Sequence, residues 1–223
     1  QRDVSGTILL SPPRREEPLE KIDFRKTMKA LYAPPATKFV EVDVPAMRFL
    51  MIDGKGDPNK AKSYAEAVEA LYSVAYTLKF AVKKELAKDY SVPPKEALWW
   101  AEYMATFVAR EKDKWSWTMM IMVPDFVPEA MVAKAIAAAG AKKALPALPL
   151  LRLDTYAEGL SVQTMHIGPY DAEGPTLMKL HNEYVPENGL VETGHHHEIY
   201  LGDPRKSAPE KLKTVLRQPV RRK

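Results

Sequence analysis

The sequence contains no cysteine, which excludes a disulfide scaffold, a thiolate nucleophile and a thiolate metal site. This absence is compatible with a reducing compartment, and we expect a cytoplasmic location. No apolar run approaches the roughly 20 residues that a membrane span needs, so we expect no membrane association. The beginning of the chain also lacks the long apolar core of a signal peptide.

The excess of charge of one sign is small. The 33 basic side chains outnumber the 29 acidic ones to give a net charge of +4, and both signs are interspersed along most of the chain. The sequence shows no helix-turn-helix, no zinc finger and no interleaving of basic and aromatic residues. We therefore expect no specific nucleic-acid partner. The 223 residues, 46% of them hydrophobic, suit one large domain or two small ones with a sizeable core.

Hydrophobic periodicity and the breaks made by proline and glycine divide the chain into two similar halves. Each half is expected to run strand, strand, helix, strand, strand, which indicates an internal duplication at the level of elements. The longest helix is expected at about 60–89, where apolar side chains recur every three or four residues. We assign a partly irregular leader (1–37) with one short helix around 24–32, a single domain (38–218) made of a first repeat (38–123), a linker helix segment (124–149) and a second repeat (150–218), and a basic tail (219–223).

Strand and helix signals that alternate in this way predict an α+β fold. We expect an antiparallel sheet with its helices on one face, and a concave, helix-free face that forms a ligand cleft. The strands are predicted at 38–44, 47–52, 98–104, 115–123, 150–156, 160–167, around 198 and at 211–218.

The strand through Glu198 has the most informative pattern. Ile199 and Leu201 suit a core, and side chains alternate along a strand, so Glu198 and Tyr200 share the other face. A carboxylate in mid-strand is either solvated on an open sheet face, which is the commoner case, or held in a pocket. The three preceding histidines do not predict a metal site, because neighbouring side chains on a strand point to opposite faces. We expect no metal and no cofactor.

Four stretches together resemble stand-alone GyrI-like proteins, which are related to SOUL-type domains. They are Val44–Gly56, Trp115–Ile121, Met165–Asp171 and the strand around Glu198. The resemblance covers about residues 24–218. It implies a duplicated strand–helix–strand–strand fold whose cleft binds bulky aromatic or cationic small molecules.

The resemblance also implies roles for single residues. In drug-sensing members a buried glutamate at the position of Glu198 receives the ligand, and some stand-alone members are hydrolases that open the cyclopropane ring of duocarmycin-type compounds. By this similarity Glu198 is the expected base. The chain departs from the family pattern Leu-Glu-Gly-Leu at Lys95 and Ala97, which leaves the substrate preference open.

Ring opening by water needs a base for the water and a hydrogen-bond donor for the oxygen that becomes a phenolate. Glu198 and Tyr170 are the expected catalytic residues, and Tyr200 and His166 are further possible donors. His166 and Tyr170 equally suit a structural role at the Gly-Pro turn. Aromatic walls would hold a flat substrate, and the expected ligand-binding residues are Trp99, Tyr103, Trp117, His166 and Tyr200.

The sequence therefore predicts a hydrolase that detoxifies cyclopropanoid or related aromatic electrophiles. The alternatives are a protein that sequesters bulky aromatic or cationic drugs without turnover, and a modulator of a protein partner such as a topoisomerase. Transcriptional regulation is disfavoured because no recognition helix is readable in the leader. A homodimer is left open by the sequence.

Overall fold

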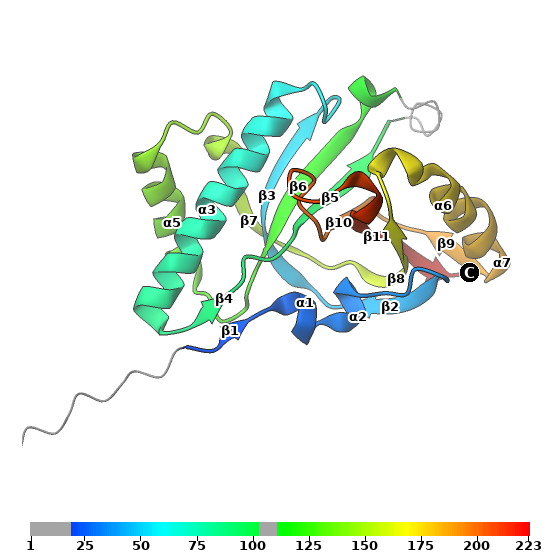
Figure 1. Ribbon diagram of the computed structural model, residues 1–223, viewed down its shortest axis with the longest axis horizontal. Helices are drawn as coiled ribbons and strands as arrows, with labels where there is room; N and C mark the ends of the chain where they lie inside the picture. Colours follow the sequence, from blue (N-terminus) through cyan, green and yellow to red (C-terminus); the bar gives the residue numbers. More distant parts are fainter. Residues whose placement is uncertain (1–18, 103–110) are drawn as a thin grey trace, which may run out of the picture.

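The computed structural model describes residues 19–102 and 111–223, arranged as one large sheet with helices against it (Figure 1). The strands are β1 (Lys21–Ile22), β2 (Val40–Val44), β3 (Met47–Lys55), β4 (Asp89–Tyr90), β5 (Lys95–Trp100), β6 (Ser116–Val123), β7 (Arg152–Tyr156), β8 (Gly159–Ile167), β9 (Leu190–Glu192), β10 (His196–Tyr200) and β11 (Lys213–Arg222). The helices are α1 (Phe24–Thr27), α2 (Lys29–Tyr32), α3 (Lys62–Leu86), α5 (Glu129–Lys142), α6 (Gly174–Lys179) and α7 (Val185–Glu187), with a π-helical turn over Leu180–Tyr184.

The large sheet has the strand order β2-β8-β11-β10-β5-β6-β3-β7, and β9 pairs with β11 outside this path. Every pairing within it is antiparallel. The predicted α+β class and antiparallel sheet are therefore confirmed. β1 and β4 form a separate parallel pair.

The sheet order also shows the duplication. β5, β6 and β3 of the first half lie beside β10, β11 and β8 of the second, and the first strand of each half pairs with the other half. β2 lies against β8 with Val40 opposite Gln163, and β7 lies against β3 with Arg152 opposite Met51, so the two exchanged strands have matching registers. β5 and β10 meet at the centre, where Ala97 faces Glu198 across the pseudo-two-fold axis.

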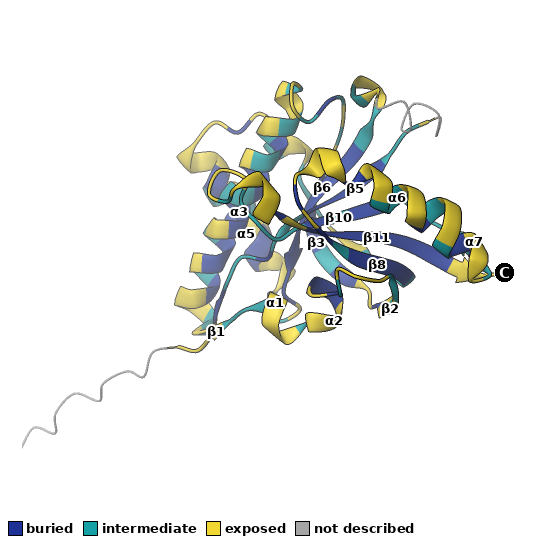
Figure 2. Cartoon of the chain, turned by 45° about the vertical axis from the view of Figure 1, so that its right-hand side comes forward, coloured by how far each residue is buried: buried dark blue, intermediate teal, exposed yellow. Residues whose placement is uncertain are grey.

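Two groups of helices cover one face of the sheet. The buried apolar stripe of α3 packs with α5 over β3, β5 and β6, as its three-to-four-residue periodicity predicts. α6, α7 and the turn between them pack over the β8–β11 half, where Val162, Leu180 and Val220 are buried together. The helices thus cover the two outer parts of this face, and Figure 2 shows that the strands behind them are largely buried.

The position of Glu198 corrects one prediction. Glu198 was expected on a helix-free face, but it lies on the same face as α3 and α6. The physical reason is that α3 and α6 lie over different halves of the sheet, and side chains of the central strands β5 and β10 line a cleft between them.

The opposite face is covered by the N-terminal segment. Residues 19–36 form β1, α1 and α2, and Leu31 and Tyr32 of α2 are buried against this face. The predicted short helix around 24–32 is two one-turn helices. The expected basic tail is not separate, because β11 continues to Arg222 and pairs with β9.

Candidate functional site

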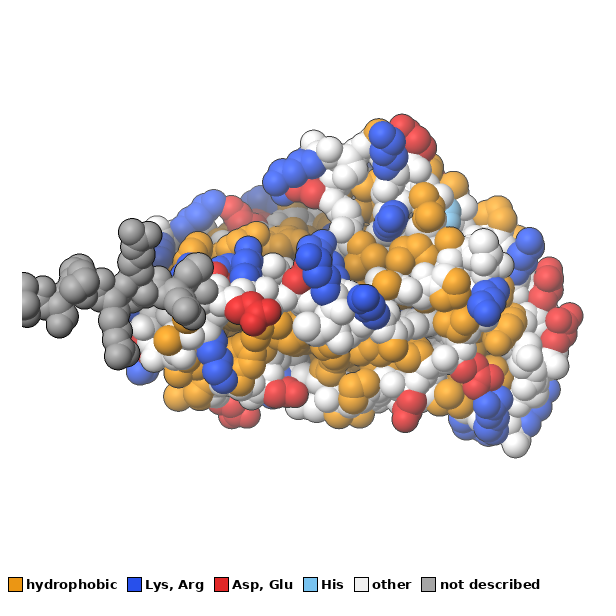
Figure 3. All heavy atoms as spheres, turned by 60° about the horizontal axis from the view of Figure 1, so that its bottom comes forward, with side chains coloured by type: hydrophobic (Ala, Val, Ile, Leu, Met, Phe, Trp, Pro, Cys, Tyr) orange, Lys and Arg blue, Asp and Glu red, His pale blue; other side chains and the backbone are white. Residues whose placement is uncertain are grey.

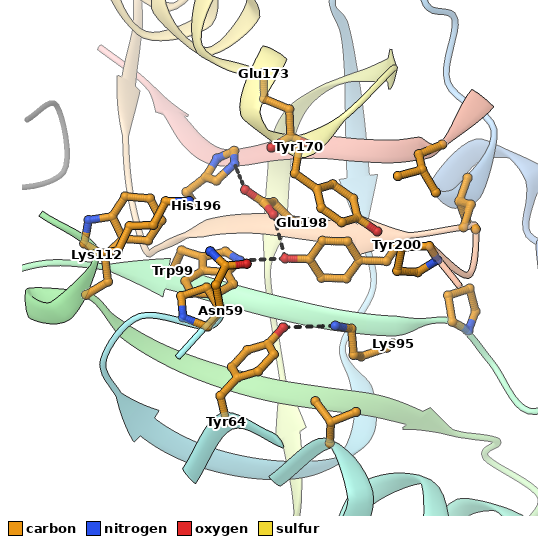
Figure 4. A pocket seen from close by; sticks show the side chains of 18 of the residues that line it. Asn59, Tyr64, Lys95, Trp99, Lys112, Tyr170, Glu173, His196, Glu198 and Tyr200 are labelled. Carbon is orange, nitrogen blue, oxygen red and sulfur yellow. Dashed lines mark hydrogen bonds and ion pairs between the residues drawn. The ribbon is translucent and has the colours of Figure 1, made fainter. Parts of the chain in front are cut away.

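A cleft of about 2000 Å³ lies between α3 and α6, with the central strands as its floor. The floor is formed by side chains of β5 and β10 that point to the helix-bearing face, and aromatic and apolar side chains of α3 and α6 form the walls (Figure 4). The residues that carry the argument below are Tyr64 from α3, Lys95 and Trp99 from β5, Tyr170 from the turn before α6, and His196, Glu198 and Tyr200 from β10.

Glu198 is held in the floor by its strand. Ile199 is completely buried on the opposite face, so the alternation of β10 fixes Glu198 and Tyr200 toward the cleft. The Tyr200 hydroxyl donates to Glu198 Oε2 at 2.6 Å, and Trp99 Nε1 donates to the Tyr200 oxygen at 3.0 Å. This chain of hydrogen bonds orients the carboxylate and leaves its Oε1 turned toward His196 (Figure 4).

The electrostatic surroundings keep Glu198 ionised. Its side chain is 12% exposed, and burial by itself raises the pKa of a carboxyl. His196, Tyr200 and the ammonium of Lys95 outweigh burial and hold the pKa of Glu198 below its usual value. His196 Nε2 lies 3.6 Å from Glu198 Oε1, beside the carboxylate. At neutral pH Glu198 can therefore accept a proton.

Lys95 is the second charged group of the floor. Its Nζ donates to the Tyr64 hydroxyl at 3.0 Å and lies 4.4 Å from the centroid of the Tyr200 ring. Burial lowers the pKa of Lys95 to about 8, and the charge of Glu198 only partly opposes that shift. The ammonium is thus still largely protonated at pH 7.

Tyr170 closes one side of the cleft. Its ring stands edge-on to that of Tyr200 with centroids 5.5 Å apart, and its side chain remains partly exposed. Burial, with the charges of Glu173 and Glu198, raises the pKa of Tyr170 to about 12. Its hydroxyl is therefore a neutral hydrogen-bond donor at any physiological pH.

Comparison with known proteins identifies the family. Residues 37–221 match the model of the GyrI-like small molecule binding domain. The chain belongs to the GyrI-like family. The crystal structure of a conserved protein from Listeria innocua is 42% identical, with a TM-score of 0.82, over 90% of this chain and 100% of that one.

Two further solved structures are hydrolases from Listeria innocua. One is 40% identical with a TM-score of 0.77 over 90% of this chain and 100% of that chain. The other is 41% identical with a TM-score of 0.80 over 91% of this chain and 100% of that chain. A comparison with curated proteins found no match.

Four residues selected from the sequence of this GyrI-like protein line the cleft together, namely Trp99, Tyr170, Glu198 and Tyr200. Tyr103 lies outside the described residues. His166 does not line the cleft, because its Nε2 turns back to the Pro169 carbonyl at 3.1 Å, where it must donate. Its role is to hold the turn that carries Tyr170.

Trp117 also does not reach the cleft. The side chain is 1% exposed, since its ring lies over Gly54 on the neighbouring strand. The ring meets Tyr64 edge-on, with centroids 5.3 Å apart. Trp117 therefore supports the Tyr64 wall from behind, and its expected contact with ligand is corrected.

A network of buried charges lies directly beneath the cleft, on the opposite face of the sheet. His197 Nε2 lies 2.9 Å from Glu96 Oε2, and its Nδ1 lies 3.0 Å from both oxygens of Glu158. Arg217 donates to Glu158 Oε2 at 3.1 Å. The two carboxylates and two cations balance only if His197 is protonated.

The ionisation of this network agrees with its geometry. Burial would lower the pKa of His197, but Glu158 and Glu96 raise it to about 9. Burial would raise the pKa of Glu158, but His197 and Arg217 lower it to about 2. The network also holds the N-terminal segment, because Arg217 donates to the Leu31 carbonyl at 2.7 Å and the Tyr32 hydroxyl donates to Glu96 at 3.1 Å.

Sequence reasoning missed this network, although His197 and Arg217 are charged residues within predicted strands; the sequence does not show that they meet. Among the described residues, no three histidine or carboxylate side chains are grouped so that they could hold a metal ion. No described helix combines the length and apolar character needed to cross a membrane. On the face that Figure 3 shows, basic and acidic side chains are interspersed.

Proposed function

We propose that this protein is a hydrolase that opens the cyclopropane ring of duocarmycin-type or related aromatic electrophiles, with Glu198 as the base. The observation that carries the proposal is an ionised, oriented carboxylate in the floor of an aromatic cleft. The identity of about 40% to hydrolases from Listeria innocua over 90% of this chain supports it.

The proposed reaction adds one water to the substrate. A water molecule attacks the unhindered cyclopropane carbon, a carbon–oxygen bond forms, and a carbon–carbon bond of the three-membered ring breaks. The electron pair of the broken bond passes through the conjugated ring to the carbonyl oxygen, which becomes a phenolate. Glu198 takes the proton of the attacking water, and the phenolate oxygen finally takes a proton in its turn.

The hydrogen bonds within the cleft divide the proposed roles. The Tyr200 hydroxyl donates its single hydrogen to Glu198. Tyr200 therefore orients the base and does not donate a hydrogen bond to the substrate oxygen. Tyr170 lines the cleft with a neutral hydroxyl, and we assign it as a donor to the developing phenolate. Trp99, stacked near Tyr64 with centroids 6.2 Å apart, offers an aromatic surface for a flat substrate.

The test follows a cyclopropyl-dienone compound by mass spectrometry in the presence of catalytic amounts of protein. We expect many equivalents of product heavier by one water. Glu198→Gln keeps the shape but removes the base, so turnover should fall at least ~10²-fold while binding of the aromatic compound survives. Glu187→Gln, at an exposed position on α7, is the matched control and should retain full turnover. Unchanged turnover in Glu198→Gln would remove Glu198 from the mechanism.

The second candidate is binding of the aromatic compound without turnover. The family description as a small molecule binding domain favours it. In that case the same mixture gives a stable complex and no hydrated product, and Glu198→Gln changes affinity only.

A further inference from the structure

Lys95, which is partly buried in the floor of the cleft, differs from the buried Lys79 of α3. Lys79 Nζ forms an ion pair with Asp89 Oδ1 at 2.6 Å, as a buried cation usually does. Among the described residues, no carboxylate oxygen lies within 4.0 Å of Lys95 Nζ, whose partners are the Tyr64 hydroxyl and the face of the Tyr200 ring. Within the described part of the chain, Lys95 is therefore a cation held in a cleft without a direct counter-ion.

The hydrogen bond between Lys95 and Tyr64 leaves donors available for a ligand. Lys95 donates one of its three N–H groups to the Tyr64 oxygen, so the Tyr64 O–H hydrogen is free to turn toward the cleft. In the part of the chain that the structure describes, no group accepts a hydrogen bond from this hydroxyl. The two groups thus present a charged donor and a neutral donor at one place.

The Lys95–Tyr64 pair and Glu198 lie at different places on the floor, which would give a bound ligand a preferred orientation. Lys95 pairs with Tyr200 across β5 and β10, and Glu198 pairs with Ala97, so the two charges occupy diagonal positions on the same floor. Figure 4 shows the Lys95–Tyr64 pair on the α3 side and the Glu198–Tyr200 pair on the other side. An aromatic ligand that lay across the floor would have one edge beside the Glu198 carboxylate and the other beside the hydrogen-bond donors of Lys95 and Tyr64.

We propose that Lys95 and Tyr64 form an oxyanion subsite, which binds the carbonyl or phenolate oxygen of an aromatic ligand and makes the cleft reject cations. This inference rests on the proposed function for the identity of that oxygen, since ring opening turns a carbonyl oxygen into a phenolate. It adds to the neutral hydroxyl of Tyr170 a charged group that stabilises the negative charge. The Lys95 ammonium, which has no direct carboxylate partner among the described residues, would also repel a cationic drug bound at the same floor.

The other lysines that line the cleft, Lys62, Lys112 and Lys206, do not offer the same site, since Lys62 Nζ lies 3.1 Å from Glu66 Oε1 and Lys206 is exposed to solvent. Lys112 Nζ lies 3.4 Å from Asp171 Oδ1, so its charge has a carboxylate partner. Among the titratable side chains that line the cleft, Tyr64 and Tyr200 contact the Lys95 ammonium, and the charge of Glu198 acts on it.

Binding of three matched probes tests the proposal without requiring turnover. 2,4-Dinitrophenolate carries the oxyanion, 2,4-dinitroanisole is its neutral counterpart, and 4-nitrophenyltrimethylammonium is a cation, each measured by titration calorimetry at neutral pH. We expect wild type to prefer the phenolate over the anisole. In Lys95→Met that preference should fall about tenfold or more, which is the effect of one hydrogen bond to a charged group, and affinity for the cation should rise.

Three variants complete the design. Lys84→Met, at an exposed position of α3, should behave as wild type. Tyr64→Phe should reduce the phenolate preference by a smaller factor. Equal preference in wild type and Lys95→Met overturns the proposal, and so does a preference that is lost in Tyr170→Phe but kept in Lys95→Met.

A measurement on wild type keeps the test decisive if Lys95→Met does not fold. The phenolate preference should decline as pH rises through about 8, where the free Lys95 side chain loses its proton, and a preference that persists well above that pH contradicts the subsite. The two proposals fail differently. Absence of hydrated product leaves the probe preferences unchanged, whereas a wrong subsite leaves turnover and its dependence on Glu198 intact.

Discussion

Replacement of His197 by glutamine should destabilise the protein strongly. His197 bridges Glu96 and Glu158 with contacts of 2.9 and 3.0 Å, and all three side chains are essentially inaccessible to solvent. Without the imidazolium, two buried carboxylates share only the positive charge of Arg217. Removal of one partner from a buried ionic group costs about 3–5 kcal/mol, since a charge is left without compensation.

This cost is a large part of the ~5–15 kcal/mol by which a folded domain is usually stable. Urea unfolding followed by circular dichroism at pH 6 measures it. His181→Gln is the matched control, because His181 pairs with Glu192 at the surface, with side-chain exposures of 22% and 34%. The control should lose less than about 1 kcal/mol. Equal stability of His197→Gln and wild type would contradict the charge balance assigned to the network.

The pH dependence of stability gives a second readout of the same group. The pKa of His197 is raised in the folded state from 6.5 to about 9, so its contribution is fully present below pH 6.5 and is lost as pH rises toward 9. Wild type should therefore lose stability across this range. His197→Gln should lack this loss, and an identical slope in the two proteins would refute the assignment.

Two other predictions concern packing and the pH dependence of turnover. Gly54→Ala should cost about 1–3 kcal/mol in unfolding experiments, because a Cβ there would overlap the Trp117 ring, whereas Gly174→Ala meets no atom within 4 Å and should be nearly neutral. Turnover of the cyclopropyl-dienone should follow a bell-shaped pH profile. Its acidic limb should lie below the usual carboxyl range, where Glu198 becomes protonated, and its alkaline limb near 8 should disappear in Lys95→Met.

Local patterns in the sequence were sufficient for much of this fold. The alternation around Ile199 placed Glu198 and Tyr200 on one face, and the periodicity of 60–89 identified α3. These features depend on neighbours along the chain. The duplication could also be predicted, because the same order of strands and helices occurs in both halves of the sequence.

Features that depend on distant parts of the chain were not readable. Which face of the sheet stays open depends on where α3 and α6 dock, and the position of Trp117 depends on its pairing with Gly54. The same holds for Lys95, whose role follows from its approach to Tyr64 on α3. A sequence does not show whether charged residues that lie far apart along the chain meet in the fold, so the network around His197 became visible only in the structure.

The exchange of edge strands makes the two halves of this protein dependent on each other during synthesis. β2 finds its partner β8 only after about 120 further residues have emerged, and the outer edge of β3 stays unprotected until β7 arrives. Such long-range pairing slows folding and leaves unpaired strand edges exposed in a nascent chain. A fragment that ends after the first half would therefore be expected to aggregate.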